Sequence, residues 1–173
     1  LYPFQKDAVI DAYRRLQKYG GVFLADVPGL GKTYMGSALL AHLQEEGERA
    51  IVICSPKIQE QWEQVLDDYN VNAKVISRDH NKIAEIINDD RMMQRQVILI
   101  DEAHHFRNPE TISYKDLQII CEGKKVILVG ATPQNLRILD IYHQLKLFHP
   151  QEMTEILRID PPDLKKFFDK ADE

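Results

Sequence analysis

The sequence predicts an α/β fold in which helices cover both faces of a doubly wound, mostly parallel sheet. Short apolar runs alternate with helix-like stretches along the chain. These runs are mostly unbroken Val, Ile and Leu, as expected of strands that are buried on both faces of a parallel sheet. The residues suited to chemistry follow the runs directly, at the carboxyl ends of strands, where such folds bind their ligands.

The individual elements follow from their apolar patterns. The predicted strands cover residues 22–24, 51–54, 74–76, 97–100 and 126–129. The predicted helices cover residues 5–19, 32–44, 58–69, 81–87, 136–148 and 163–170. We expect one domain over residues 1–150, because the strands and their helices end there. Prolines and a short charged helix mark residues 151–173 as an extension or the start of a linker.

Composition restricts the class of protein. The chain has 173 residues, of which 44% are hydrophobic and 28% charged, which is enough for one domain with its own core. No apolar run approaches a bilayer span and no leader pattern opens the sequence, so we expect a cytoplasmic location. Cys54 and Cys121 lack metal-ligand spacing, and we expect two buried, reduced thiols. Because the chain starts at Leu1, we expect a piece of a longer protein.

A candidate phosphate site follows the first predicted strand, where residues 25–33 read ADVPGLGKT ahead of a helix. A helix N-terminus directs backbone N–H groups and a positive dipole end at an anion, and Gly29 and Gly31 allow close wrapping of the backbone. Lys32 would contact the β and γ phosphates of ATP, and Thr33 would offer its hydroxyl to Mg²⁺. The candidate loop comprises Asp26, Val27, Pro28, Gly29, Leu30, Gly31, Lys32 and Thr33.

A candidate acidic pair follows the fourth predicted strand, where residues 97–105 read VILIDEAHH. Asp101 would hold Mg²⁺, partly through water, and Glu102 would orient and activate the attacking water. Together with Lys32 these are the predicted catalytic residues, and Thr33 and Asp101 are the predicted metal ligands. His104 is assigned to coupling, because a histidine in this place is more often structural than catalytic.

At this point the motifs resemble those of superfamily 2 helicases, and within them the Swi/Snf-type ATPases. GLGKT and DEAH carry the broader resemblance, and they imply the N-terminal lobe of RecA-like fold. The pair Ala25-Asp26 is similar to the pair that this family has before its glycines, and it accounts for the missing first glycine of the strict phosphate loop. Residues 2–5, YPFQ, resemble the family's opening element, which implies that Gln5 binds adenine.

Two further segments resemble functional motifs of the same family. Residues 54–56, CSP, resemble a motif that touches the nucleic-acid backbone, and residues 130–135, GATPQN, resemble a motif that couples hydrolysis to strand movement. The implied nucleic-acid contacts are Ser55, Pro56, Lys57, Gln134 and Asn135, and the implied coupling residues are His104, Ala131 and Thr132. Trp62 is expected in the core, and the departures at residues 27–28 and 130–135 point to a prokaryotic relative.

The resemblance implies the ATP-binding lobe of a DNA-dependent ATPase that moves on duplex DNA between two lobes. Nothing after Pro150 resembles the second lobe with its arginine finger, so residues 1–173 alone should hydrolyse ATP poorly. The net charge of -5 taken alone argues against a nucleic-acid binder. Two alternatives therefore stay open: an RNA helicase of the same superfamily, and a nucleotide-gated interaction module in a larger defence or restriction complex.

Overall fold

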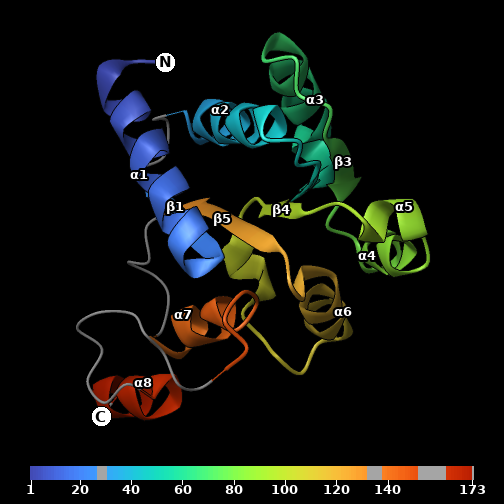
Figure 1. Ribbon diagram of the computed structural model, residues 1–173. Coiled ribbons are helices and arrows are strands. Elements are labelled where there is room, and N and C mark those ends of the chain that lie inside the picture. The colour runs from blue at the N-terminus through green and yellow to red at the C-terminus, as the bar shows by residue number, and fades with distance from the viewer. Residues whose placement is uncertain (27–30, 132–137, 152–162, 173) are drawn as a thin grey trace.

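A computed structural model describes residues 1–26, 31–131, 138–151 and 163–172 (Figure 1). The strands are β1 Gly21–Asp26, β2 Ala50–Cys54, β3 Lys74–Ser77, β4 Val97–Ile100 and β5 Lys125–Ala131. The helices are α1 Pro3–Tyr19, α2 Lys32–Glu45, α3 Gln59–Asp68, α4 His80–Ile87, α5 Asp90–Met93, α6 Ile112–Cys121, α7 Ile138–Leu145 and α8 Leu164–Asp172. Two short 3₁₀ turns, η1 Pro56–Ile58 and η2 Ala103–Phe106, follow β2 and β4.

The described strands form one parallel sheet in the order β1-β5-β4-β2-β3. All five predicted strands are confirmed. Because every pair is parallel, the carboxyl ends of the strands lie at a single edge of the sheet. The segments that follow β1, β2 and β4 carry the phosphate loop, the candidate nucleic-acid motif and the acidic pair, so these three motifs share that edge.

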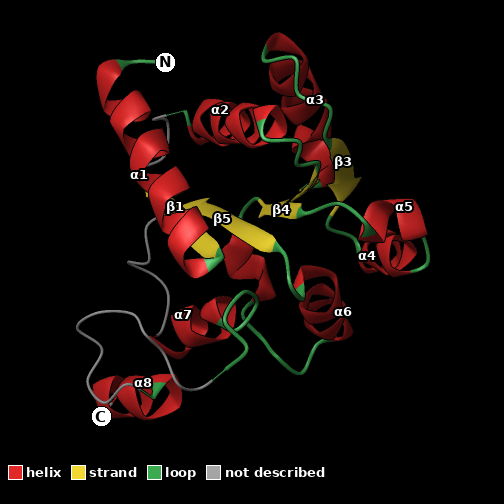
Figure 2. Cartoon of the chain, in the orientation of Figure 1, coloured by secondary structure: helices red, strands yellow, loops and turns green. Residues whose placement is uncertain are grey.

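Helices cover both faces of the sheet, which confirms the doubly wound fold (Figures 1 and 2). One core cluster joins α1, α2 and α3 to the side chains of Val97 and Leu99 in β4. The other joins α4 and α6 to the alternate side chains of the same strand, Ile98 and Ile100. All four β4 residues are fully buried, which explains why the strand is an unbroken apolar run.

Two helices were not predicted from the sequence, α5 and α6. Asp89 is the N-cap of α5, because its carboxylate accepts hydrogen bonds from the backbone N–H groups of Arg91 and Met92. Thr111 is the N-cap of α6 in the same way, with its hydroxyl accepting from the N–H of Tyr114 at 3.3 Å. Both helices therefore start at ordinary capping residues. The residues that follow each cap show no clear helical pattern in the sequence.

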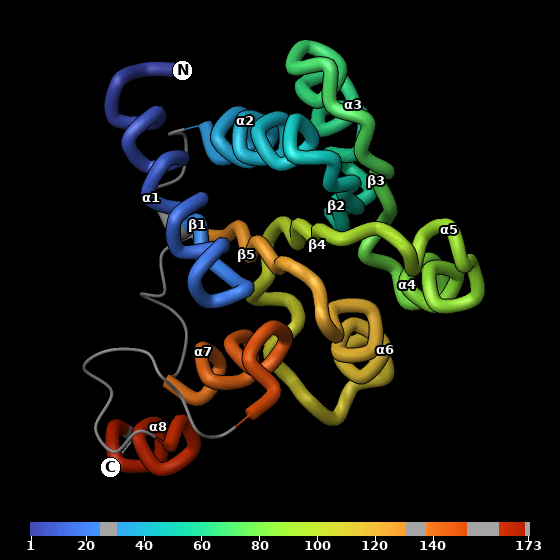
Figure 3. Tube along the Cα trace, viewed as in Figure 1, coloured from blue at the N-terminus to red at the C-terminus, as the bar shows by residue number. Residues whose placement is uncertain are grey.

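The C-terminal helix α8 lies close to α7 (Figure 3). Leu164 is fully buried, and the rings of Tyr142 and Phe168 meet with their centroids 5.7 Å apart. Residues 163–172 therefore pack onto the domain that precedes them. The division of the chain at residue 150 stays a prediction.

The two cysteines are buried and unbridged, as expected. Burial raises the pKa of the Cys54 thiol and of the Cys121 thiol to about 12. Both thiols are therefore protonated and unreactive near neutral pH. Within the described ranges, none of the helices combines the length and the apolar character that crossing a membrane would require.

Candidate nucleotide-binding site

The end of the phosphate loop lies against helix α1. Gly31 is the N-cap residue directly before α2 and has a left-handed φ of 79°, a conformation that glycine adopts without strain. A Cβ atom on Gly31 would also lie only 2.7 Å from Nε2 of Gln5, so a side chain here would clash as well as strain the backbone. Lys32 and Thr33 follow as the first, half-buried residues of the helix.

Part of the predicted loop lies outside the described residues. This applies to Val27, Pro28, Gly29 and Leu30 and to the side chain of Asp26, whose backbone is the last residue of β1. Their assigned roles stay predictions.

Gln5 occupies a place consistent with a base-binding role. It is only 6% exposed, and its Oε1 accepts a hydrogen bond from the backbone N–H of Tyr2 at 2.8 Å. A cavity of about 330 Å³ opens beside it, lined by Leu1, Tyr2, Gln5, Tyr34 and Tyr69. Aromatic faces and one amide are suited to a purine ring. The sequence motif indicates Gln5 and includes Tyr2, but Tyr34 comes from α2 and Tyr69 is the residue after α3, and no local pattern connects these two to Gln5.

Asp101 is fixed in a buried position at the end of β4. It is 6% exposed; Oδ1 accepts from the backbone N–H of Glu102 at 2.8 Å, and Oδ2 accepts from Nε1 of Trp62 at 2.8 Å. Burial raises the pKa of the Asp101 carboxyl, and its two hydrogen bonds and the charge of Lys32 act in the opposite direction. Because β1 and β4 both pair in parallel with β5, helix α2, which begins at Lys32, and the acidic motif both follow strands that end at the same edge of the sheet.

Glu102 is placed differently from its neighbour. Its backbone has a left-handed φ of 52°, which is uncommon for a residue with a side chain and turns the chain sharply at the sheet edge. The side chain is 36% exposed, and its Oε2 lies 3.1 Å from Nδ1 of His104. One carboxylate is thus buried and fixed while the next reaches solvent, an arrangement that suits a metal ligand and a base for water. His104 contacts this carboxylate and not Asp101, in keeping with a supporting role.

The candidate nucleic-acid motif lies at the same edge, on the neighbouring strand. Ser55 is the N-cap of η1, and its Oγ accepts from the backbone N–H of Lys57 at 3.4 Å. Pro56 and Lys57 are exposed. Because β2 pairs directly with β4, this turn is the neighbour of Asp101. The remaining candidates Thr132, Gln134 and Asn135, and the side chain of Ala131, lie outside the described residues.

The oxygen ligands available at this edge fit Mg²⁺. Among the described residues no group of three or more His, Cys, Asp or Glu side chains could enclose a metal ion. Mg²⁺ is usually held by one or two protein oxygens together with phosphate and water. A hydroxyl from Thr33 and a carboxylate from Asp101 match that incomplete set of hard oxygen ligands, in which a bound triphosphate supplies the rest.

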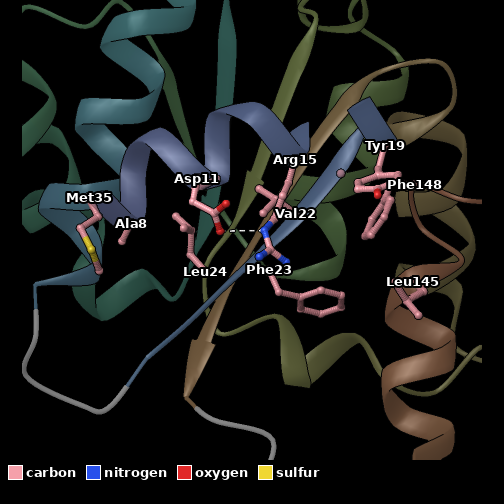
Figure 4. A pocket seen from close by; sticks show the side chains of 12 residues that line it. Ala8, Asp11, Arg15, Tyr19, Val22, Phe23, Leu24, Met35, Leu145 and Phe148 are labelled. Carbon is pink, nitrogen blue, oxygen red and sulfur yellow. Dashed lines mark hydrogen bonds and ion pairs between the residues drawn. The ribbon is translucent and has the colours of Figure 1, made fainter. Parts of the chain in front are cut away.

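A second cavity, of about 500 Å³, lies between α1, β1 and the residues at the end of α7 (Figure 4). Its walls are mainly apolar, with Phe23 and Phe148 among them. Its charged groups, Asp11 and Arg15, form an ion pair with each other at 2.7 Å on the α1 surface. None of the candidate catalytic residues lines this cavity, and we assign no chemistry to it.

Comparison with known proteins agrees with this fold. The Swi2/Snf2 ATPase core of Sulfolobus solfataricus, solved in complex with double-stranded DNA, has the same fold: the TM-score is 0.72 at 20% identity, over 97% of this chain and 38% of the archaeal one. The fold therefore defines a RecA-like lobe of the kind found in ATPases. The sequence model of the family described as "AAA domain" matches residues 1–171. The chain belongs to this family. Its similarity to SWI/SNF-related proteins supports an N-terminal lobe of the superfamily 2, Swi/Snf type.

Two curated relatives are similar to this chain over most of its length. The chain is 28% identical to the SWI/SNF-related matrix-associated actin-dependent regulator of chromatin subfamily A-like protein 1 of Drosophila melanogaster, over 89% of this chain and 22% of that protein. It is also 28% identical to the DNA annealing helicase and endonuclease ZRANB3 of Mus musculus, over 88% of this chain and 16% of that protein. The chain thus spans about a fifth of the length of such relatives.

Proposed function

We propose that this chain is the ATP-binding lobe of a DNA-dependent ATPase that couples ATP hydrolysis to movement along duplex DNA. The observation that carries the proposal is the parallel pairing of β1, β5, β4 and β2, which leads Lys32, the acidic pair and the η1 turn to one edge of the sheet. The similarity to a DNA annealing helicase and to an ATPase core bound to double-stranded DNA supports DNA as the polymer. The RNA helicase alternative is not favoured.

In the proposed chemistry, different residues bind different parts of ATP. Gln5 binds the adenine, and the loop from Asp26 to Gly31 wraps the phosphates. Lys32 balances the charge of the β and γ phosphates, while Thr33 and Asp101 hold Mg²⁺, partly through water. Bound Mg²⁺ neutralises charge on the phosphates. Glu102 then accepts a proton from the attacking water. The contact with His104 orients the Glu102 carboxylate for this step.

The proposed DNA contact extends the same edge. Ser55, Pro56 and Lys57 meet the sugar-phosphate backbone, and Gln134 and Asn135 add contacts from the segment after β5. His104, Ala131 and Thr132 couple hydrolysis to movement. Duplex DNA would lie between this lobe and a second lobe, so an overall charge of -5 on the chain does not prevent local contacts to phosphates. We place the protein in the cytoplasm, in a prokaryotic cell.

The experiment that tests this proposal is the rate of ATP hydrolysis by the full-length protein with no nucleic acid, with duplex DNA and with duplex or single-stranded RNA. Strong stimulation by duplex DNA alone is expected. Stimulation by RNA in preference to DNA would replace this proposal with the RNA helicase alternative.

Replacing Lys32 with Ala in the full-length protein should lower ATP hydrolysis by at least about a hundredfold, because it removes a charge that stabilises the transferring phosphoryl group. Hydrolysis and the biological activity of the protein should be lost together. Lys82→Ala is the matched control, because Lys82 lies on the exposed side of α4 in a surface pair with Glu85. A Lys32→Ala protein that keeps its biological activity would favour the nucleotide-gated interaction module.

Replacing Lys57 with Ala should weaken binding of duplex DNA and reduce the slope of the logarithm of affinity against the logarithm of salt concentration by about one. One phosphate contact fewer releases one counterion fewer. Lys74→Ala is the control, because Lys74 is also exposed but begins β3 at the opposite edge of the sheet. Equal salt slopes for Lys57→Ala and the parent protein would remove Lys57 from the DNA contact.

A further inference from the structure

Trp62 connects three elements of the candidate site. It belongs to α3 and has no exposed surface. Its Nε1 donates to Oδ2 of Asp101, the residue directly after β4, at 2.8 Å. Its six-membered ring lies on Gly36 of α2, one turn beyond Lys32: a Cβ atom on Gly36 would be 3.0 Å from Cη2 of the indole. The indole therefore touches the helix of the phosphate loop and the acidic motif at once.

This hydrogen bond has consequences for both partners. A buried indole N–H needs an acceptor, and a buried carboxylate is stabilised by donors that reach it in the folded state. Because one Asp101 oxygen accepts from Trp62 and the other from the backbone of Glu102, the carboxylate plane is held from both sides. Trp62 therefore fixes one oxygen of this carboxylate, and it is not itself able to contact nucleotide or metal from its buried place.

The position of Trp62 in the chain adds a second consequence. Helix α3 begins at Gln59, immediately after the η1 turn that carries Lys57. The turn has no spacer separating it from the helix, so a displacement of η1 is passed to the first turn of α3, where Trp62 lies. The Gly36 contact leaves the ring little room to move sideways. Leu99 also packs against Gly36, with its Cδ1 at 3.1 Å from the position of a Cβ atom on Gly36.

We propose that Trp62 is a positioning residue, which orients Asp101 for Mg²⁺ and passes movement of the DNA-contacting turn η1 to that carboxylate. This inference rests on the proposed function and extends it, since it names the connection between the polymer and the metal. A tryptophan that only fills the core would contribute packing, and its N–H could be removed without effect on metal binding.

The test uses Trp62→Phe in the full-length protein, which keeps an aromatic ring and removes the N–H. The first readout is the Mg²⁺ concentration that gives half-maximal binding of a non-hydrolysable ATP analogue. Loss of an outer partner of a metal ligand typically lowers metal affinity by about 10- to 100-fold, and we expect a rise of that size in the Mg²⁺ requirement. Nucleotide binding should recover at high Mg²⁺.

Tyr114→Phe is the matched control. Tyr114 is also a buried aromatic residue, and its hydroxyl donates to the backbone carbonyl of His143 at 2.5 Å, on the other face of the sheet. This variant loses one buried hydrogen bond and should keep the parental Mg²⁺ requirement. A Trp62→Phe protein with the parental Mg²⁺ requirement would overturn the orienting role, as would an equal shift in Tyr114→Phe.

The second readout is the factor by which duplex DNA stimulates ATP hydrolysis at saturating Mg²⁺. We expect Trp62→Phe to reduce this factor several-fold more than it reduces the basal rate. An unchanged factor would overturn the transmitting role. Failure of the parent protein to respond to duplex DNA at all would instead count against the proposed function, so the two failures are distinguishable.

Gly36→Ala is a second variant for the case in which Trp62→Phe does not fold. Its added methyl group presses on the indole, which must shift by a few tenths of an ångström, while the N–H remains and alanine favours the helix. It should raise the Mg²⁺ requirement in the same direction as Trp62→Phe. A folded Gly36→Ala protein with parental Mg²⁺ dependence would contradict the proposal.

Discussion

Glu102→Gln in the full-length protein should lower the rate of ATP hydrolysis by about 10²–10⁴-fold while ATP binding persists. The amide has nearly the shape of the carboxylate but cannot accept a proton from water. Glu102 is well placed for this role, because its side chain reaches solvent and its Oε2 contacts His104, whereas Asp101 beside it is buried. Single-turnover hydrolysis and equilibrium binding of ATP measure the two effects separately.

Glu110→Gln is the control for this prediction, since Glu110 is exposed and pairs only loosely with Lys115, at 3.8 Å. It should hydrolyse ATP at the parental rate. If Glu102→Gln retained more than about a tenth of the parental rate, another group would have to act as the base.

A protein consisting of residues 1–173 alone should hydrolyse ATP at least about a thousandfold more slowly than the full-length protein with duplex DNA. The described strands form a single sheet, and the lobe resembles only part of a larger ATPase core. An arginine finger from a second lobe is the contribution that this piece would lack. Steady-state ATPase assays on both proteins, at equal concentration and with saturating DNA, give the ratio.

ATP binding by residues 1–173 is the control for that comparison, because it separates a folded lobe without catalysis from a lobe that has not folded. A bound nucleotide together with negligible turnover is the expected pair of results. Rapid, DNA-stimulated turnover by these residues alone would mean that the lobe contains every group needed for the reaction.

The features that could be predicted from the sequence are those that depend on residues close together in the chain. The row Val97–Ile100 is apolar without interruption because both faces of β4 are covered, and that pattern needs no knowledge of its partners. The same is true of Gly31 and Lys32 at the start of α2, where a glycine-rich turn precedes a helix. The edge shared by the motifs also follows, because parallel strands have their carboxyl ends together.

The features that could not be predicted depend on which strands are neighbours. Strand β5 lies between β1 and β4, so residues distant in sequence determine how far apart the motifs of Lys32 and Asp101 lie along the sheet edge. Trp62 was expected in the core and is buried there, but its bond to Asp101 joins residues that only the β2–β4 pairing brings together. Likewise Tyr34 and Tyr69 line a cavity with Gln5 although nothing in their local sequence connects them.

The most direct test of the account is a crystal structure of the protein with Mg²⁺ and a non-hydrolysable ATP analogue. We predict the triphosphate at the N-terminus of α2, with Nζ of Lys32 in contact with the β and γ phosphates and Mg²⁺ between Thr33 and Asp101, reached partly through water. The base should occupy the cavity beside Gln5. A nucleotide bound elsewhere, or a metal ion with no link to Asp101 either directly or through water, would contradict the account.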